Sequence, residues 1–296
     1  MARSEQEVVF RTGPLVNLPA LVASLGCDPV PLFESCGFDI NDFHPDTPLP
    51  YVKVSRLLAH CTRATHSEHL GLLLGQMASA SHIGLPAFLL ASAPTVEAGL
   101  HALQDSFDLH DRGGILSFDT GTRHTTLGYS LLLPGTEAPA QIYDLSAVMM
   151  YQTMRKLCGR EWVADSVSLE RRKPRDTAPY QAFFRTNIYF DATDTSITFS
   201  NRWLSMEPAS ADPLLFEHLS QEAAALRHQR GNDIKEALPA VMRTVLLSRE
   251  HSASQVASAL GIHERTLHRR LKAANTNFRD ELDKARRAMS EELLAG

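Results

Sequence analysis

The stretch Ser252–Asn275 most constrains what this chain can fold into. Ala257, Gly261 and Leu267 are separated by four and then six residues, which is the spacing of two short helices joined by a tight turn. In such a motif a small residue lets the second helix approach closely, a glycine takes the left-handed turn, and an apolar residue packs the second helix against the first. The spacing therefore predicts a helix-turn-helix with its turn at Gly261.

The second predicted helix has one apolar and one cationic face. Arg265, Arg269 and Lys272 recur at i, i+4 and i+7, opposite Leu267 and Leu271. A helix of this kind has the shape that enters the major groove of DNA. The spacing alone leaves open an ordinary helical hairpin whose arginines are solvated.

The first residues of a recognition helix face base edges. Arg265 and Arg269 are each able to pair bidentately with a guanine, which discriminates between bases by about 1–3 kcal/mol for a good pair. Phosphate contacts position a protein on DNA without reading sequence. The predicted base-reading residues are His263, Glu264, Arg265, Thr266, His268 and Arg269, and the predicted phosphate contacts are Arg270, Lys272 and Arg279.

Charge is unevenly distributed along the chain. The 296 residues carry a formal net charge of −5, yet the residues from Gly231 onward hold eleven Lys/Arg and nine Asp/Glu, which leaves −7 on residues 1–230. Between Ser252 and Arg279 five basic residues accompany one acidic residue, Glu264. An acidic body with one basic helix indicates a DNA-reading module attached to a separate sensor.

Cysteine usage and hydropathy predict a cytoplasmic protein that does not enter a membrane. The cysteines show no paired metal spacing and lie among apolar residues, which indicates reduced, buried thiols. From the residues after Met1 we expect no signal peptide. The longest apolar run, Ile83–Ala93, contains Pro86 and is far shorter than the roughly 20 residues that span a bilayer. The four cysteines are Cys27, Cys36, Cys61 and Cys158.

No motif of an enzyme or a cofactor site is present. The sequence lacks a Gly-x-Ser-x-Gly elbow, a phosphate-binding Gly-Lys-Ser/Thr loop and a His-Glu-x-x-His pair. We therefore expect neither an enzyme nor a bound cofactor. One group invites a metal interpretation, but its spacing is irregular for zinc, so surface histidines are the preferred explanation. That group is His60, Cys61, His66, Glu68 and His69, and the further histidines at 82, 101, 110 and 124 are scattered.

The order of predicted elements indicates an α+β sensor domain with a small antiparallel sheet, followed by an all-α domain. Alternating residues predict strands, whereas apolar residues at helical spacing predict helices. Within the sensor, Trp162, Tyr143 and Tyr151 either line a ligand pocket or fill the core, and the core is favoured. Strands are expected at 115–119, 125–133, 163–170, 188–190 and 197–199, and helices at 15–25, 31–36, 51–64, 68–77, 83–91, 96–107, 142–157, 180–184, 214–228 and 233–247.

Most of the chain resembles the AraC-type (AraC/XylS) transcriptional regulators whose sensor is an arabinose-binding-like domain. In the carboxy-terminal part the matching residues are Val256, Ala257, Leu260, Gly261, Arg265, Thr266, Leu267, Arg269, Arg270, Leu271, Phe278, Leu282, Arg286 and Arg287. In the amino-terminal part they are Ile83, Gly84, Ser92, Ala93, Pro94, Thr95, Ala98, Ala178, Pro179, Tyr180, Phe183, Phe184 and Asn201.

The resemblance implies a domain organisation. Residues 1–208 would form an effector-binding and dimerisation domain, 209–232 a connector helix and linker, and 233–296 a partial DNA-binding domain. The family carries two helix-turn-helix units joined by a long helix. If Thr276–Leu294 is that linking helix, the second unit is absent from this chain. A second departure is His263, which stands where the family has a serine cap and which costs about 1 kcal/mol of local helix stability.

Two hypotheses for function follow. In the first, the chain is a sequence-specific regulator that binds promoter DNA as a homodimer, responds to a small organic effector, and, as the resemblance implies, activates transcription through RNA polymerase. In the second, it is a truncated sensor and dimerisation module with little DNA affinity of its own, because one helix-turn-helix offers few phosphate contacts.

Overall fold

The computed structural model describes residues 8–133, 136–230, 238, 241–242, 252–259, 264–273 and 276–295. It divides into two compact units, Met1–Ala223 and Ala224–Gly296. We treat each unit by itself. Of the features expected from the sequence, the turn glycine Gly261, its neighbours Leu260 and Ile262, and His263 lie outside the described residues.

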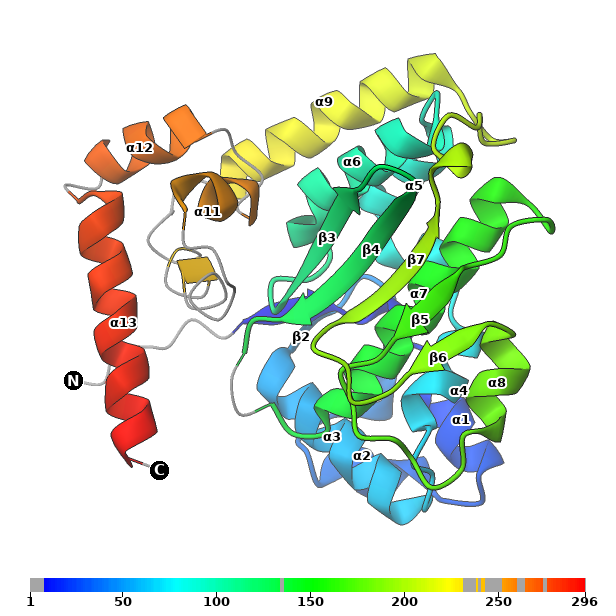
Figure 1. Ribbon diagram of the computed structural model, residues 1–296. Helices are drawn as coiled ribbons and strands as arrows, with labels where there is room; N and C mark the ends of the chain where they lie inside the picture. The colour runs from blue at the N-terminus through cyan, green and yellow to red at the C-terminus, as the bar shows by residue number, and fades with distance from the viewer. Residues whose placement is uncertain are drawn as a thin grey trace. The chain divides into compact units, whose positions relative to one another are not determined.

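The first unit is a mixed α/β fold built on a five-stranded sheet (Figure 1). The strand order is β3-β4-β7-β5-β6, and every pair is antiparallel except β5 and β6, which run parallel. The expectation of an antiparallel sheet is therefore wrong at one edge, where α8 turns the chain so that β6 returns in the direction of β5. The strands are β3 (Gly114–Thr120), β4 (His124–Leu131), β5 (Ser166–Ser168), β6 (Asn187–Tyr189) and β7 (Thr195–Ser200).

A second, two-stranded sheet near the amino terminus was not expected. It pairs β1 (Val9–Arg11) with β2 (Pro48–Pro50) in antiparallel register, with Phe10 opposite Leu49. Prolines donate no backbone hydrogen bond, so a strand that begins and ends with proline carries a weak sequence signal. The pairing places β1 beside the start of α3, where the Tyr51 backbone N–H donates to the Val8 carbonyl across 2.8 Å.

Helices pack against the sheet and against one another. Both α6 and α7 contact the large sheet and lie on one of its faces (Figure 1). On β4, Thr125, Leu127 and Tyr129 are buried in alternation, as expected of a strand with one face toward the core. The helices are α1 (Leu18–Ser24), α2 (Pro29–Glu34), α3 (Tyr51–Ala64), α4 (Leu70–Met77), α5 (Leu85–Ser92), α6 (Val96–Ser106), α7 (Pro139–Cys158), α8 (Ala178–Phe184) and α9 (Pro213–Arg230).

Two glycines bring α4 against α7. A Cβ atom on Gly71 would lie 2.0 Å from the Gln141 carbonyl oxygen, and one on Gly75 would lie 2.7 Å from Val148 Cβ. The Gly71 N–H also donates to Gln141 Oε1 across 2.7 Å. The Gly-x-x-x-Gly spacing thus supports a close helix–helix contact inside a globular unit, a role that resembles its use in membrane helices.

A buried ionic cluster fixes the loop after β5 to α7. Asp144 is fully buried and pairs with Arg171, whose side chain is 7% exposed. The Tyr180 hydroxyl donates to Asp144 Oδ2 across 2.6 Å and also contacts Arg171. Burial raises the pKa of Asp144 to about 6, although Arg171 and Tyr180 lower it. The chain therefore balances one buried carboxylate with a buried guanidinium.

The elements described in the second unit are all helices. It contains α11 (Ala253–Ala259), α12 (Glu264–Ala273) and α13 (Phe278–Ala295). Of the helix expected over 233–247, residues 238, 241 and 242 are described, and all three are helical and buried. The core of the unit also includes Val256, Ala257, Leu267, Leu271 and Leu282.

Candidate functional site

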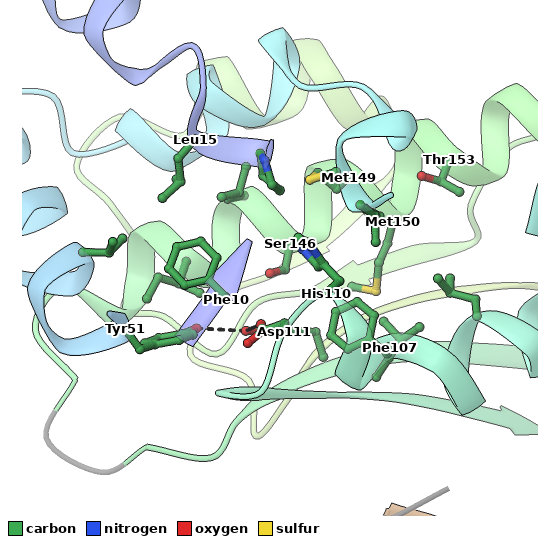
Figure 2. A pocket seen from close by; sticks show the side chains of 18 of the residues that line it. Phe10, Leu15, Tyr51, Phe107, His110, Asp111, Ser146, Met149, Met150 and Thr153 are labelled. Carbon is green, nitrogen blue, oxygen red and sulfur yellow. Dashed lines mark hydrogen bonds between the residues drawn. The ribbon is translucent and has the colours of Figure 1, made fainter. Parts of the chain in front are cut away.

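A partly enclosed cavity lies in the first unit between β1, α3, α7 and the segment that joins α6 to β3. It holds about 790 Å³ of empty space, counted out to the solvent at its mouth. Figure 2 shows Tyr51 beside Asp111, apart from Met149 and Thr153 of α7.

Helical spacing explains most of the cavity wall. Residues three and four apart share one face of a helix. One face of α7 supplies Ile142, Leu145, Ser146, Met149, Met150 and Thr153, and α3 supplies Tyr51, Val54 and Leu58. The 3-10 turn η4 (Phe107–Leu109) and the two following residues add Phe107, His110 and Asp111. The wall is therefore mainly aliphatic and aromatic, with its polar groups confined to a few positions.

Three polar side chains form a hydrogen-bonded chain in this wall. The Tyr129 hydroxyl donates to Asp111 Oδ2 across 2.8 Å, and the Tyr51 and Tyr129 hydroxyl oxygens are 3.0 Å apart. Asp111 Oδ1 accepts the Gly113 N–H across 2.7 Å. A Cβ atom on Gly113 would lie 2.4 Å from the Tyr51 ring, and one on Gly114 would lie 2.3 Å from the Tyr129 hydroxyl. The two glycines therefore make room for the tyrosines.

Burial governs the charge of the acidic group. Asp111 is 6% exposed, and this burial raises its pKa to about 6, whereas the hydrogen bonds from Tyr129, Gly113 and Gly114 act to lower it. At pH 7 the carboxyl group is consequently ionised in most molecules. It is a negative charge held in a mainly apolar wall.

His110, which precedes Asp111, is buried and neutral. Its Nδ1 atom has no hydrogen-bond partner among the described residues. Burial, together with the positive charge of Arg11, lowers the pKa of His110 to about 3. Its ring packs edge-on against Phe107 at a centroid distance of 5.7 Å. In the sequence His110 is one of several scattered histidines, and no sequence pattern marked Tyr51, Asp111 or Tyr129 as site residues.

The second candidate site is the outer face of α12. Leu267 and Leu271 are 0% and 1% exposed, whereas the polar positions of the other face lie in solvent. Glu264 Oε1 lies 3.6 Å from His268 Nε2. The exposed residues are Glu264, Arg265, His268, Arg269 and Lys272, and Arg279 is exposed on α13. Thr266 and Arg270 belong to α12, but their side chains are not among the described parts of the chain. Exposure fits contact with DNA, and the individual roles stay predictions.

The profile of a protein family described as the arabinose-binding domain of AraC transcription regulators, amino-terminal, matches residues 26–208. The chain belongs to the AraC family. It is 24% identical over 292 residues to the HTH-type transcriptional regulator VirS of Mycobacterium tuberculosis, in strains CDC 1551 / Oshkosh and ATCC 25618 / H37Rv. That alignment covers 97% of this chain and 85% of VirS. The solved structure of the transcriptional regulator CdpR from Pseudomonas aeruginosa is similar with 26% identity and a TM-score of 0.45, covering 76% of this chain and 73% of CdpR.

The structure of the first unit decides between the two roles left open for its aromatic residues, a pocket lining or the core. Trp162, Tyr143 and Tyr151 are all buried and belong to the hydrophobic core. The Tyr151 and Trp162 rings pack edge to face at 5.1 Å. None of the three lines the cavity. The preference for a core role is therefore confirmed.

The other residues considered from the sequence occupy ordinary positions in this AraC-type unit. His60 Nδ1 lies 3.2 Å from Ser35 Oγ and 3.8 Å from Cys36 Sγ. Across the described ranges, no three His, Cys, Asp or Glu side chains come together as metal ligands would. The cysteines are free thiols, and burial raises the pKa of Cys61 and of Cys158 to about 12. In the same ranges, no helix combines the length and the apolar character that crossing a bilayer requires.

Proposed function

We propose that this AraC-type regulator binds promoter DNA through α12 and changes that binding when a small organic molecule occupies the sensor cavity. The observation that carries the DNA-binding part is the division of α12 into a buried Leu267–Leu271 face and an exposed face with Arg265, Arg269 and Lys272. Membership of the AraC family supports the same conclusion.

In this proposal the sensor is residues 1–208, the connector 209–232 and the DNA-binding region 233–296. The base-reading residues are those predicted from the sequence on α12, together with His263. The regulator acts as a homodimer and activates transcription through RNA polymerase. Coupling requires that the effector bind the DNA-competent arrangement better than the idle one, and a difference of about 1–3 kcal/mol is the usual scale.

The test starts from the intact chain. Binding sites are selected from a random duplex library, and the best site and a scrambled duplex of equal composition are titrated in a gel-shift assay at one salt concentration. We expect tighter binding to the selected site by a factor of at least about 10³. Equal, weak binding to both duplexes would favour the alternative of a sensor and dimerisation module.

The effector part of the proposal needs its own variant. Ser146 lines the cavity from α7, and Ser146→Phe would fill part of the space. We expect this variant to shift DNA affinity or to abolish its response to an effector, while Asp119→Asn on the exposed end of β3 leaves both unchanged. Unchanged regulation in the filled variant would contradict a ligand role for the cavity.

A further inference from the structure

The cavity wall carries one formal charge. Among the described residues that line it, Asp111 is the acidic one, and the lining includes no lysine and no arginine. His110 is uncharged in its buried position. A bound carboxylate or phosphate would meet the Asp111 charge with no cation in the lining to offset it, and like charges in an apolar setting repel strongly.

At the Asp111 end of the cavity, the direction of the hydrogen bonds leaves acceptors for a ligand, whereas the hydroxyl groups of Ser146 and Thr153 line the α7 wall. A phenol has a single proton, and Tyr129 gives its proton to Asp111. In the 3.0 Å contact between the two hydroxyls, Tyr51 must therefore be the donor. The Tyr51 oxygen then retains acceptor capacity, and a neutral His110 with its proton on Nε2 adds Nδ1 as an acceptor.

In the described part of the chain, the Asp111 carboxylate has one acceptor position without a hydrogen-bond donor. Its carboxylate accepts from Tyr129, Gly113 and Gly114, and a carboxylate has about four acceptor positions. The contrast with Asp144 is informative, since that buried carboxylate is paired with Arg171. Within the described residues Asp111 has no such ion pair. An isolated buried charge is costly unless a counter-charge is supplied.

We propose that the cavity takes a small, largely apolar amine, whose protonated nitrogen lies against Asp111 and Tyr51 and whose hydrocarbon part contacts α7. This inference rests on the proposed function, because it names the class of effector for the same cavity. An ammonium group offers three donors to Asp111, Tyr51 and His110. The rings of Tyr51, Tyr129 and Phe107 add faces that attract a cation.

The test uses the intact chain and three probes of similar shape, namely 2-phenylethylamine, 2-phenylethanol and 3-phenylpropanoate, with n-hexylamine, n-hexanol and n-hexanoate as a second set. Affinities are measured by titration calorimetry at pH 7.5. We expect each amine to bind more tightly than its matched alcohol and carboxylate. Asp111→Asn should weaken amine binding roughly 30-fold or more, because it removes one member of a buried charge pair, and should change alcohol binding little.

Controls separate this inference from the proposed function. Asp119→Asn removes an exposed carboxylate of the same region and should leave amine affinity unchanged, and far-ultraviolet circular dichroism checks that each variant folds. Tighter binding of a carboxylate, absence of amine binding, or equal amine affinity in Asp111→Asn would overturn the amine assignment and leave the gel-shift result untouched. Loss of sequence-selective DNA binding in the unmodified chain would instead contradict the proposed function.

Discussion

The Tyr129 hydroxyl donates to Asp111 Oδ2 across 2.8 Å, while the Gly113 N–H holds the other oxygen of the same carboxylate. Tyr129 lies on β4, and Asp111 lies in the turn before β3. The two hydrogen bonds come from the protein alone, so the carboxylate is oriented before any ligand arrives. Such preorganisation lowers the cost of binding.

Tyr129→Phe should raise the pKa of Asp111 above its value of about 6, because the variant removes a donor that favours the ionised form. It should also destabilise the first unit by about 1–3 kcal/mol, since it leaves a buried acceptor unpaired. Carbon-detected NMR of the Asp111 carboxyl group against pH measures the first effect, and urea unfolding measures the second. Tyr189→Phe, at an exposed tyrosine, is the control. An Asp111 pKa at or below about 6 in the variant would contradict this reading.

Protonation of His110 should oppose folding at mildly acidic pH. The folded-state pKa is about 3, whereas the unfolded value is about 6.5, so the unfolded chain takes up the proton first as the pH falls below 6.5. Above pH 6.5 the histidine is neutral in both states, so its burial carries no pH-dependent cost. Below pH 6.5 the unfolded chain is stabilised by proton uptake, and the free energy of unfolding falls. Asp111 and Asp144, both with folded pKa values of about 6, act in the opposite sense.

The comparison of the wild-type chain with His110→Asn isolates this effect, because both chains contain Asp111 and Asp144. Between pH 7 and pH 5 the stability of the wild type relative to the variant should fall by about 2 kcal/mol. Both tryptophans, Trp162 and Trp203, lie in the first unit, so their fluorescence during urea unfolding reports the unfolding of that unit. A pH-independent difference would show that His110 titrates normally.

Arg171→Ala should be among the most destabilising changes to a charged residue in this unit. It leaves Asp144 buried without its guanidinium, and removing one partner of a buried pair costs about 3–5 kcal/mol. Arg175→Ala provides the matched control, because the Arg175 side chain is 96% exposed and its pair with Glu68 spans 3.8 Å. The control should cost about 0–1 kcal/mol. Similar losses in urea unfolding for the two variants would rule out a special role for the buried cluster.

Gly71→Ala should destabilise the first unit even though alanine favours helices. The added methyl group would lie 2.0 Å from the Gln141 carbonyl oxygen, so α4 and α7 must separate, and overpacking of this kind costs about 1–3 kcal/mol. Gln76→Ala, at an exposed position of α4, should be close to neutral. Thermal unfolding followed by tryptophan fluorescence measures both, and an unchanged midpoint for Gly71→Ala would mean that the helices are not in close contact.

The base contacts and the phosphate contacts predicted on α12 should respond differently to mutation. Arg269→Ala should weaken binding to the selected site by about 1–3 kcal/mol and relax sequence preference, because a base contact is lost. Lys272→Ala should weaken all duplexes alike and reduce the salt dependence by about one counterion. Arg155→Ala, an exposed arginine of α7, is the control. If Arg269→Ala weakened binding to all duplexes equally, Arg269 would be a phosphate contact and not a base contact.

Local periodicity was sufficient to predict the long elements. Helix α3 spans Tyr51–Ala64 as predicted, because Val54, Leu57, Leu58 and Cys61 mark one buried face. The β1–β2 pair could not be predicted, because its strands are too short to show a periodic pattern. Each strand has three residues, the partners are about 40 positions apart, and Pro48 and Pro50 weaken the strand signal.

The cavity could not be predicted from spacing. Tyr51 and Tyr129 are 78 residues apart, and the Tyr129–Asp111 bond joins positions 18 residues apart. No local pattern encodes such pairs, because tertiary folding brings them together. The one available signal was Asp111 followed by Gly113 and Gly114 before a strand, since glycines there permit close approach of large side chains. The buried and exposed faces of α12 were predictable, because residues three and four positions apart lie on the same face of a helix.

The walls of the cavity are drawn from segments that range along the sequence from Phe10 to Thr153. A molecule bound there would hold these distant segments together, and it could bind only when all of them are in place. Occupancy would consequently appear as added resistance of the whole unit to heat, by RT ln(1 + [L]/Kd). A melting-temperature screen of compound collections on this protein is thus a test for the proposed effector that requires no knowledge of the genes the protein controls.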